Sequence, residues 1–277
     1  MARDFAAPNE TPIAQPRAQG EAFVGAAKRG ASTVVTGLRQ QGSAKALLPG
    51  RAGAHLEAVL LNTAGGVTGG DRFLYRGEAG EHAAMTMTTQ TAERAYRAQP
   101  DQIGRVETRL IAASGSTLNW LPQETILFDH AALDRRLEVD LATDATFLAC
   151  ESVVFGRAAM GERLIHLHFR DNWRVRRDGR LIFAEALRID GDPDAILNGQ
   201  AALAGAGAMA TALYAGTAAE TKLTAVRAML PETAGASAFE DKLVVRVLAA
   251  DAFTLRRTTI PLIELLSGRK PPKVWML

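Results

Sequence analysis

Short apolar segments separated by glycine-containing turns recur along this chain, and they constrain its fold more than any other feature. Each segment is too short for an ordinary helix and is rich in Val, Thr, Leu and Ile. Between Arg105 and Leu110, polar and apolar residues alternate, which is typical of a strand with one face in water. The pattern predicts a mainly β fold with many short strands in stacked sheet layers. The segments are Val34–Leu38, Leu56–Leu61, Ala84–Thr89, Ile103–Ile111 and Thr117–Leu121.

Two later segments extend the β pattern. Leu164–Phe169 alternates in the same way, and Trp173–Phe183 contains an Asp-Gly pair near its centre. This dipeptide suits a two-residue turn in which both central residues have a positive φ. We therefore predict a β-hairpin around Asp178 and Gly179.

Helical periodicity is confined to the last third of the chain. Thr217–Met229 has apolar residues at helical spacing, and Pro231 ends the pattern. Asp251 can cap a second helix that runs toward Leu266, whereas Val244–Leu248 is typical of a strand. The predicted fold is thus mainly β, with a few helices in the C-terminal third.

The chain divides into two unequal parts. Residues 1–31 are rich in Ala, Gln, Pro and Gly without hydrophobic periodicity, which predicts a flexible leader. Residues 32–277 are predicted to form a single domain. With 277 residues, of which 47% are hydrophobic, the chain can bury one large core.

Charge and composition exclude several classes of protein. Lys and Arg number 32 against 30 Asp and Glu, which leaves no electrostatic footprint for nucleic acid or an anionic membrane. Ala195–Ala219 carries no charge, but its Ala-rich and Gly-rich composition favours a packed interior stretch over a membrane span. Residues 1–20 lack the apolar stretch of a secretory signal, and Cys150 has no cysteine to pair with. We therefore expect a soluble, cytoplasmic protein.

The segment Leu60–Asp71 is the most conspicuous motif, because it holds four glycines within six residues. A phosphate-binding loop would need a lysine after the glycines, and a dinucleotide-binding loop would need different spacing. Neither condition is met, so the residues alone favour a structural turn.

Some side chains could carry metal or docking chemistry. His166 and His168 are two residues apart in a strand pattern, so both could face one metal ion, although the sequence supplies no third ligand beside them. A pair of surface histidines is the alternative. The arginines between Arg170 and Arg180 form the densest basic cluster, which indicates either a solvated face or a docking surface for an acidic partner.

Two carboxylates lie inside apolar stretches, Glu151 and Glu185. A buried carboxylate is costly unless it is paired, hydrogen-bonded or facing water. Such oxygens could line a wet passage for a hard divalent cation, or they could form ordinary buried ion pairs. The residues alone leave both interpretations open.

Five ordered motifs resemble those of one family, the urease accessory protein UreD, which is called UreH in some bacteria. The resemblance runs from about Ser32 to the C-terminus, and five motifs in order are more specific than one glycine motif. The motifs are Leu61–Asp71, Thr88–Arg97, Leu121–Phe128, Phe155–Glu162 and Pro272–Trp275.

The resemblance implies a mainly β protein that is not an enzyme. It implies binding to the urease structural subunits and to a UreF-like accessory protein, through which a UreG-like GTPase joins the assembly. The assembly delivers nickel to the urease active site, and UreD-like proteins contain internal passages. Ni²⁺ would then be a cargo in transit, with no tightly bound cofactor. Neither nucleic acid nor a membrane is an expected partner.

The resemblance also singles out site residues. Asp71 closes the glycine motif as an acidic residue does in the family, and Glu151 stands where relatives carry a carboxylate. Glu185 has a matching place after the Asp-Gly hairpin. We expect these three side chains to line a hydrated path for Ni²⁺. Carboxylates without a full set of imidazole or thiolate ligands hold nickel weakly, which suits release.

Glu93 is a secondary candidate, because some relatives have a small hydroxyl residue at its position. His166 and His168 belong to no motif of the family and could make only transient contact with nickel. Two alternatives remain, a scaffold without a nickel path and a metal-dependent hydrolase that uses the two histidines.

The candidate partner contacts are Arg174 and Arg176 in the hairpin and Trp275 near the C-terminus. Exposed arginine and aromatic side chains are favoured at interfaces. A terminal tryptophan can equally pack onto its own domain.

Overall fold

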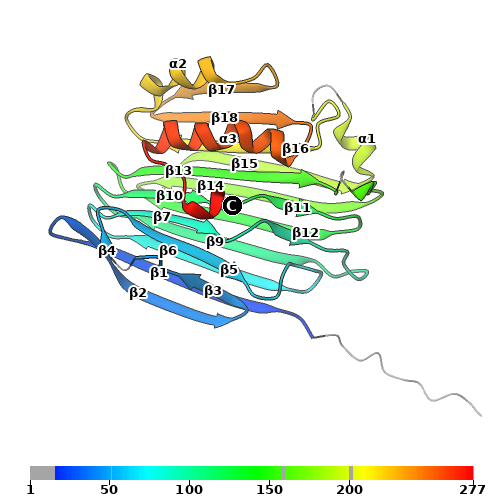
Figure 1. Ribbon diagram of the computed structural model, residues 1–277, viewed down its shortest axis with the longest axis horizontal. Helices are drawn as coiled ribbons and strands as arrows, with labels where there is room; N and C mark the ends of the chain where they lie inside the picture. Colours follow the sequence, from blue (N-terminus) through cyan, green and yellow to red (C-terminus); the bar gives the residue numbers. More distant parts are fainter. Residues whose placement is uncertain (1–15, 51, 158–159, 200–201, 277) are drawn as a thin grey trace, which may run out of the picture.

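The computed structural model describes residues 16–276 except 51, 158–159 and 200–201, and it consists of two stacked β-sheets with helices on one side (Figure 1). Sheet A has eight strands in the order β15-β14-β12-β9-β6-β1-β2-β4. Sheet B has ten, with β17-β18-β16-β13-β10-β7-β5-β3 as its main path; off this path, β11 pairs with β13, and β8 pairs with β11. The predicted fold class is confirmed.

The strands of sheet A are β1 (Gln19–Arg29), β2 (Ser32–Gly42), β4 (Ala52–Gly53), β6 (Arg72–Ala79), β9 (Gly104–Ala112), β12 (Ala132–Leu141), β14 (Leu167–Arg177) and β15 (Arg180–Gly191). Those of sheet B are β3 (Ala44–Leu47), β5 (Leu56–Asn62), β7 (Ala84–Thr89), β8 (Glu93–Ala95), β10 (Thr117–Leu121), β11 (Thr125–Leu127), β13 (Thr146–Phe155), β16 (Ala208–Ala215), β17 (Ala234–Phe239) and β18 (Lys242–Ala249).

The middle of the chain alternates between the two sheets. Strands β5, β7, β10 and β13 pair in parallel in sheet B, while β6, β9, β12 and β14 do so in sheet A. Apart from the short sheet B strands β8 and β11, each of these strands is followed by a strand of the other sheet before the chain returns. Because neighbouring strands are parallel, their carboxyl ends lie at the same edge of sheet B. The sequence predicted stacked sheets but not this parallel pairing.

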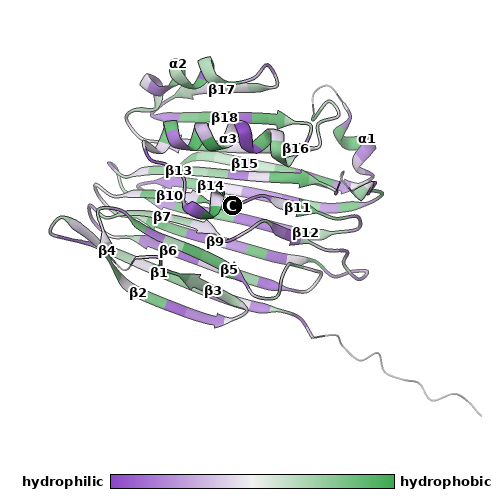
Figure 2. Cartoon of the chain, in the orientation of Figure 1, coloured by the Kyte–Doolittle hydropathy of each residue, from purple (hydrophilic) through white to green (hydrophobic). Residues whose placement is uncertain are grey.

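The main core fills the space between the sheets. Phe73 and Leu137 from sheet A and Met85 and Leu118 from sheet B are fully or almost fully buried there. Each large apolar side chain contributes about 1.5–3 kcal/mol on burial. The strands accordingly alternate hydrophobic and hydrophilic residues along their length (Figure 2).

The two longer helices pack against sheet B, as Figure 1 shows for α3, whereas the shortest helix contacts β15 of sheet A. The helices are α1 (Pro193–Leu197), α2 (Ala219–Met229) and α3 (Ala252–Ser267), followed by the 3₁₀ turn η2 (Lys273–Met276). Asp251 caps α3 by accepting a hydrogen bond from the Thr254 N–H at 2.7 Å. Both predicted helices are confirmed. Within the described part of the chain, no helix has the length and apolar character needed to cross a membrane.

The predicted leader is wrong over part of its length. Residues 1–15 lie outside the described residues, but β1 begins at Gln19 and pairs with both β2 and β6. Its buried positions are Ala22, Val24, Gly25 and Ala26. Three of these four are alanine or glycine, so the strand gives little hydrophobic signal in the sequence.

The charge-free stretch Ala195–Ala219 includes β16. Every residue of β16 is buried, which confirms the predicted interior position for that part of the stretch. The Asp-Gly hairpin is also confirmed, since Asp178 has a φ of 49° and Gly179 a φ of 76°.

Candidate functional site

Four loops converge at one edge of sheet B, because each follows the carboxyl end of a strand in that sheet. The loops come after β5, β7, β10 and β13 and contain the first four sequence motifs. Backbone hydrogen bonds join them. The Val67 N–H donates to the Arg94 carbonyl at 2.7 Å, and the Glu93 N–H donates to the Glu124 carbonyl at 2.9 Å. Motifs far apart in the sequence thus form one contiguous region.

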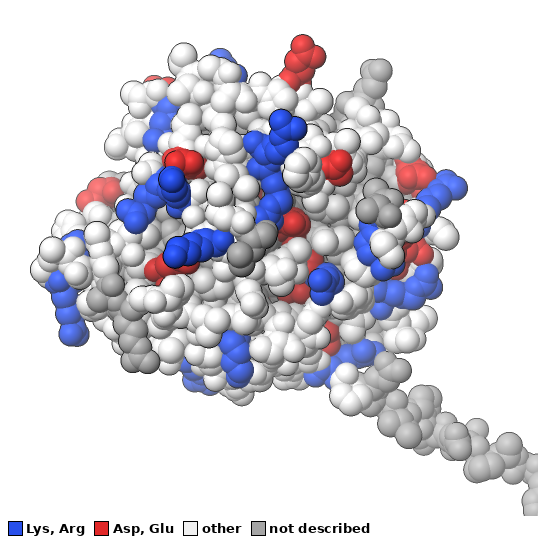
Figure 3. Space-filling view, in the orientation of Figure 1, with Lys and Arg blue, Asp and Glu red and all other residues white. Residues whose placement is uncertain are grey.

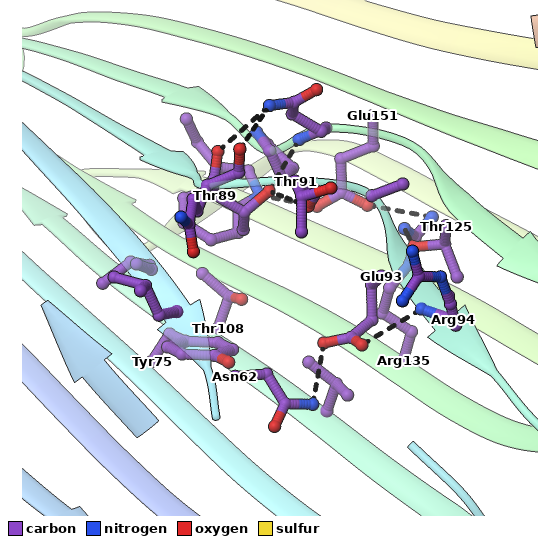
Figure 4. Close-up of a pocket in the computed structure, with 18 of the residues that line it drawn as sticks. Asn62, Tyr75, Thr89, Thr91, Glu93, Arg94, Thr108, Thr125, Arg135 and Glu151 are labelled. Atoms are coloured by element: carbon purple, nitrogen blue, oxygen red, sulfur yellow. Dashed lines mark hydrogen bonds and ion pairs between the residues drawn. The ribbon is translucent and has the colours of Figure 1, made fainter. Parts of the chain in front are cut away.

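A cavity of about 100 Å³ opens beneath these loops and extends between the sheets (Figure 4). A water needs about 10–15 Å³ of such space, so several waters fit. The lining combines motif residues with inward-facing side chains of both sheets, among them Asn62, Tyr75, Thr89, Glu93, Thr108, Trp120, Thr125, Arg135 and Glu151.

Glu93 stands on the loop side of this cavity. Its Oε2 accepts a hydrogen bond from the Asn62 side-chain amide at 3.1 Å, so the first and second motifs meet at this carboxylate (Figure 4). Burial raises the pKa of the Glu93 carboxyl, which the amide hydrogen bond partly opposes.

Glu151 lies deeper, on β13, with only 4% of its surface exposed. The Trp120 indole N–H donates to its Oε1 at 2.6 Å, whereas its Oε2 accepts no hydrogen bond from any described residue. Burial raises the pKa of Glu151 to about 7, although the neighbouring Arg135 favours its ionised form.

Arg135 is the charged partner of this carboxylate. Its Nη2 lies 3.0 Å from Oε2 of Glu151. Its Nε and Nη2 also donate to the two carboxylate oxygens of Asp171 at 3.1 and 2.5 Å, and its Nη1 donates to Thr125 at 3.1 Å. The Arg135 guanidinium therefore pairs with two buried carboxylates, those of Glu151 and Asp171.

A second, much smaller cavity of about 10 Å³ begins on the other side of this guanidinium. Arg135 and Glu151 line both cavities, and Asp171 and Glu185 line the second. The Glu185 carboxylate pairs with Arg246 at 2.7 Å and is partly exposed. The structure thus places three predicted carboxylates, Glu93, Glu151 and Glu185, along two adjoining cavities.

Asp71 has a different position. Its two oxygens accept hydrogen bonds from the Ala18 and Thr68 backbone N–H groups at 2.7 and 2.9 Å, and it lines neither cavity. Its carboxylate fastens the glycine loop to the residue before β1. The loop itself contains positive-φ glycines, as a structural turn requires.

The two predicted histidines do not share a strand, because β14 begins at Leu167 and leaves His166 in the preceding loop. His166 lies beside His130, with ring centroids 5.9 Å apart. His168 lies 3.1 Å from Asp134 and 3.5 Å from Asp190. The described residues contain no group of three or more His, Cys, Asp or Glu that could hold a metal ion. Nothing in this arrangement favours the hydrolase alternative.

The prediction of Trp275 as an exposed partner contact is wrong. Its side chain is buried, and its indole N–H donates to Thr88 at 3.0 Å and to the Leu121 carbonyl at 3.2 Å. The tail packs onto its own domain and joins the fifth motif to the second and third.

Arg174 and Arg176 lie on the outer face of sheet A, since the alternate residues of β14 are buried. Arg174 lines a groove of about 330 Å³ in that face, where arginines outnumber the two carboxylates; the lining includes Arg105, Arg136, Arg170, Glu107 and Asp134. On the face that carries α3, basic and acidic side chains are interspersed (Figure 3).

Sequence reasoning missed Arg135 and Asp171. A signal was available, because each is a charged residue at an inward position of an alternating strand. Leu133 and Leu137 flank Arg135, while Phe169 and Trp173 flank Asp171, each two residues away on the same buried face.

Comparison with known proteins supplies a family. The chain matches the family described as UreD urease accessory protein over residues 18–276. It is 49% identical to the urease accessory protein UreD of Rhizobium etli over 94% of this chain and 96% of the relative. Identity to the proteins of the same name is 46% in Roseobacter denitrificans, over 96% and 98% of the two chains, and 48% in Ruegeria pomeroyi, over 90% and 97%.

Proposed function

Because the chain belongs to the UreD family of urease accessory proteins, we propose that it acts without catalysing a reaction, by binding urease apoprotein and guiding Ni²⁺ toward the urease active site. A UreF-like protein and, through it, a UreG-like GTPase would complete the assembly in the cytoplasm. No tightly bound cofactor is needed, since nickel is the cargo.

One observation carries the nickel path. Glu93, Glu151 and Glu185 follow one another along two cavities that meet at Glu151, beneath loops that hold the first four motifs. Carboxylate oxygens bind Ni²⁺ without the affinity of imidazole or thiolate sets, so they suit transfer. Asp71 supports this path indirectly, through the loop that it fastens. His166 and His168 lie outside the cavities and would make at most transient contacts.

The test is co-expression of the chain with urease structural subunits and the UreF-like and UreG-like partners. Single Glu93→Ala, Glu151→Ala and Glu185→Ala variants should assemble normally but lower the nickel content of purified urease. Glu138→Ala is the matched control, because this carboxylate lies on the outer face of sheet A and pairs with Arg136. Normal nickel content in all three cavity variants would favour the scaffold alternative.

Partner docking has a separate test. The arginine-lined groove on the outer face of sheet A fits an acidic partner surface, and Arg174 and Arg176 both lie on that face. A double charge reversal, Arg174→Glu with Arg176→Glu, should weaken co-purification with urease or the UreF-like protein. Lys270→Glu, an exposed residue beyond α3, is the control. Unchanged co-purification would remove this face as a docking surface.

A further inference from the structure

The guanidinium of Arg135 blocks the connection between the two cavities. It lines both, and its hydrogen bonds to Asp171 and its contact with Glu151 fix it at their junction. The cavity beyond it measures about 10 Å³, which is at or below the space that one water requires. In this conformation neither hydrated nor partly hydrated Ni²⁺ can pass.

The same guanidinium occupies the position that a metal ion would take. A divalent cation bound by oxygen needs carboxylates that converge on one point. Glu151 and Asp171 converge on Nη2 of Arg135, at 3.0 and 2.5 Å, and Thr125 adds a hydroxyl oxygen near Nη1. The atoms that hold Arg135 are thus the ligands that a hard cation would use.

The charge balance of this cluster favours a divalent ion. Two carboxyl groups, those of Glu151 and Asp171, face a single guanidinium, and Oε2 of Glu151 meets Arg135 in an ion pair rather than in a hydrogen bond. A cation of charge +2 would compensate both groups as carboxylates and would take the place of Arg135 beside Oε2. Burial is the main cause of the raised pKa of Glu151, and Arg135 opposes it only in part.

The larger cavity has room for the Arg135 side chain once it is displaced. Arg135 already borders the larger cavity, whose wall also carries the Glu93 carboxylate (Figure 4). A swing of the guanidinium toward Glu93 would open the junction and keep the positive charge paired.

We propose that Arg135 is a removable plug in a latent divalent-cation site formed by Glu151 and Asp171, and that a divalent cation replaces its guanidinium when the passage opens. The inference rests on the proposed function, because it assigns a closed state to the proposed nickel path. It adds a binding site and a positioning residue that control that path.

The experiment measures Ni²⁺ binding to the isolated full chain by equilibrium dialysis with nickel chloride alone. Arg135→Gln should bind one Ni²⁺ per chain more than wild type does, with an affinity at least tenfold higher than any binding of wild type at this site. Ni²⁺ should also raise the Tm of the variant. Arg136→Gln is the matched control, because the adjacent arginine is exposed on the outer face of sheet A. It should behave as wild type.

The double variants Arg135→Gln/Glu151→Gln and Arg135→Gln/Asp171→Asn should lose the additional ion. A folded Arg135→Gln chain with wild-type nickel binding would overturn the proposal, as would binding that survives both double changes. If Arg135→Gln folds only with Ni²⁺ present, the metal has replaced the missing cation, which supports the proposal. If Ni²⁺ does not rescue its folding, and a folded chain with the neutral change Arg135→Met binds no more nickel than wild type, the proposal is wrong.

These readouts need no urease, so they separate the plug from the nickel path. Additional binding in Arg135→Gln, combined with normal urease loading by Glu151→Ala, would preserve the latent site and refute the path. Absent binding, combined with impaired loading by Glu151→Ala, would refute only the plug.

Discussion

Arg135 and Asp171 are direct register partners on the adjacent parallel strands β12 and β14, and both side chains point into the space between the sheets. The pair is bidentate, with two nearly parallel hydrogen bonds from one guanidinium to one carboxylate. Such fork-to-fork pairing fixes geometry as well as charge. It therefore orients the guanidinium for its second contact with Glu151.

Asp171→Asn should destabilise the fold, because it removes one of the two carboxylates that pair with the buried positive charge of Arg135. We expect a loss of about 3 kcal/mol in the free energy of unfolding, measured by urea denaturation. Asp140→Asn, an exposed residue on β12, should change it by less than about 0.5 kcal/mol. Equal, small losses in both variants would mean that the pair is not structural.

Glu151 should make stability depend on pH in the direction opposite to an ordinary salt-bridged carboxylate. Its pKa is raised to about 7 in the folded chain, chiefly by burial, from 4.5 when unperturbed. Between these values the folded chain binds more protons than the unfolded chain, so the free energy of unfolding falls as pH rises. The Glu151 contribution is therefore greatest below about pH 4.5 and is lost by about pH 7.

The measurement compares wild type with Glu151→Gln by urea denaturation at several pH values from 5 to 8. Wild type should lose stability relative to the variant as pH rises, with most of the change between pH 5 and 7. Glu138→Gln controls for a partly exposed carboxylate. Parallel pH profiles for wild type and Glu151→Gln would contradict the raised pKa.

Trp275→Ala should cost about 3–5 kcal/mol of the free energy of unfolding, because a buried indole and its hydrogen bonds are lost together. Arg256 also packs over the ring, with its guanidinium carbon 5.2 Å from the ring centroid. Met276→Ala is the control, since this neighbouring side chain is 69% exposed. A small effect of Trp275→Ala would indicate a tail that detaches easily and remains available to a partner.

Local signals account for the parts of the fold that the sequence predicted. The Asp178-Gly179 turn and the Asp251 cap each depend on a few neighbouring residues, and both form as expected. The β1 strand was missed because three of its four buried residues, Ala22, Gly25 and Ala26, are alanine or glycine.

The site was harder to predict because its contacts are non-local. Arg135 and Asp171 are 36 positions apart, and only the parallel register of β12 and β14 brings them together. Glu151 and Glu185 were identified because a charge inside an apolar stretch needs an explanation, and both line the cavities. The same argument, applied to every inward position of an alternating strand, would have found Arg135.

Variants of Asp71 can distinguish a structural role of this residue from a direct role in nickel transfer. Asp71→Ala would leave the partly buried backbone N–H groups of Ala18 and Thr68 without their acceptors, at a cost of about 1 kcal/mol in the free energy of unfolding. Asp71→Asn keeps one acceptor oxygen and should recover part of that loss. Hydrogen exchange at the Thr68 amide should accelerate in the order wild type, Asp71→Asn, Asp71→Ala.

Nickel loading of urease then distinguishes the two roles. If Asp71 acts only by fastening the glycine loop, loading should follow the exchange order, so that Asp71→Asn is intermediate. If its carboxylate contacts nickel, Asp71→Asn should load as poorly as Asp71→Ala despite a better-held loop. Because both oxygens already accept backbone hydrogen bonds and neither cavity includes Asp71, we expect the first outcome.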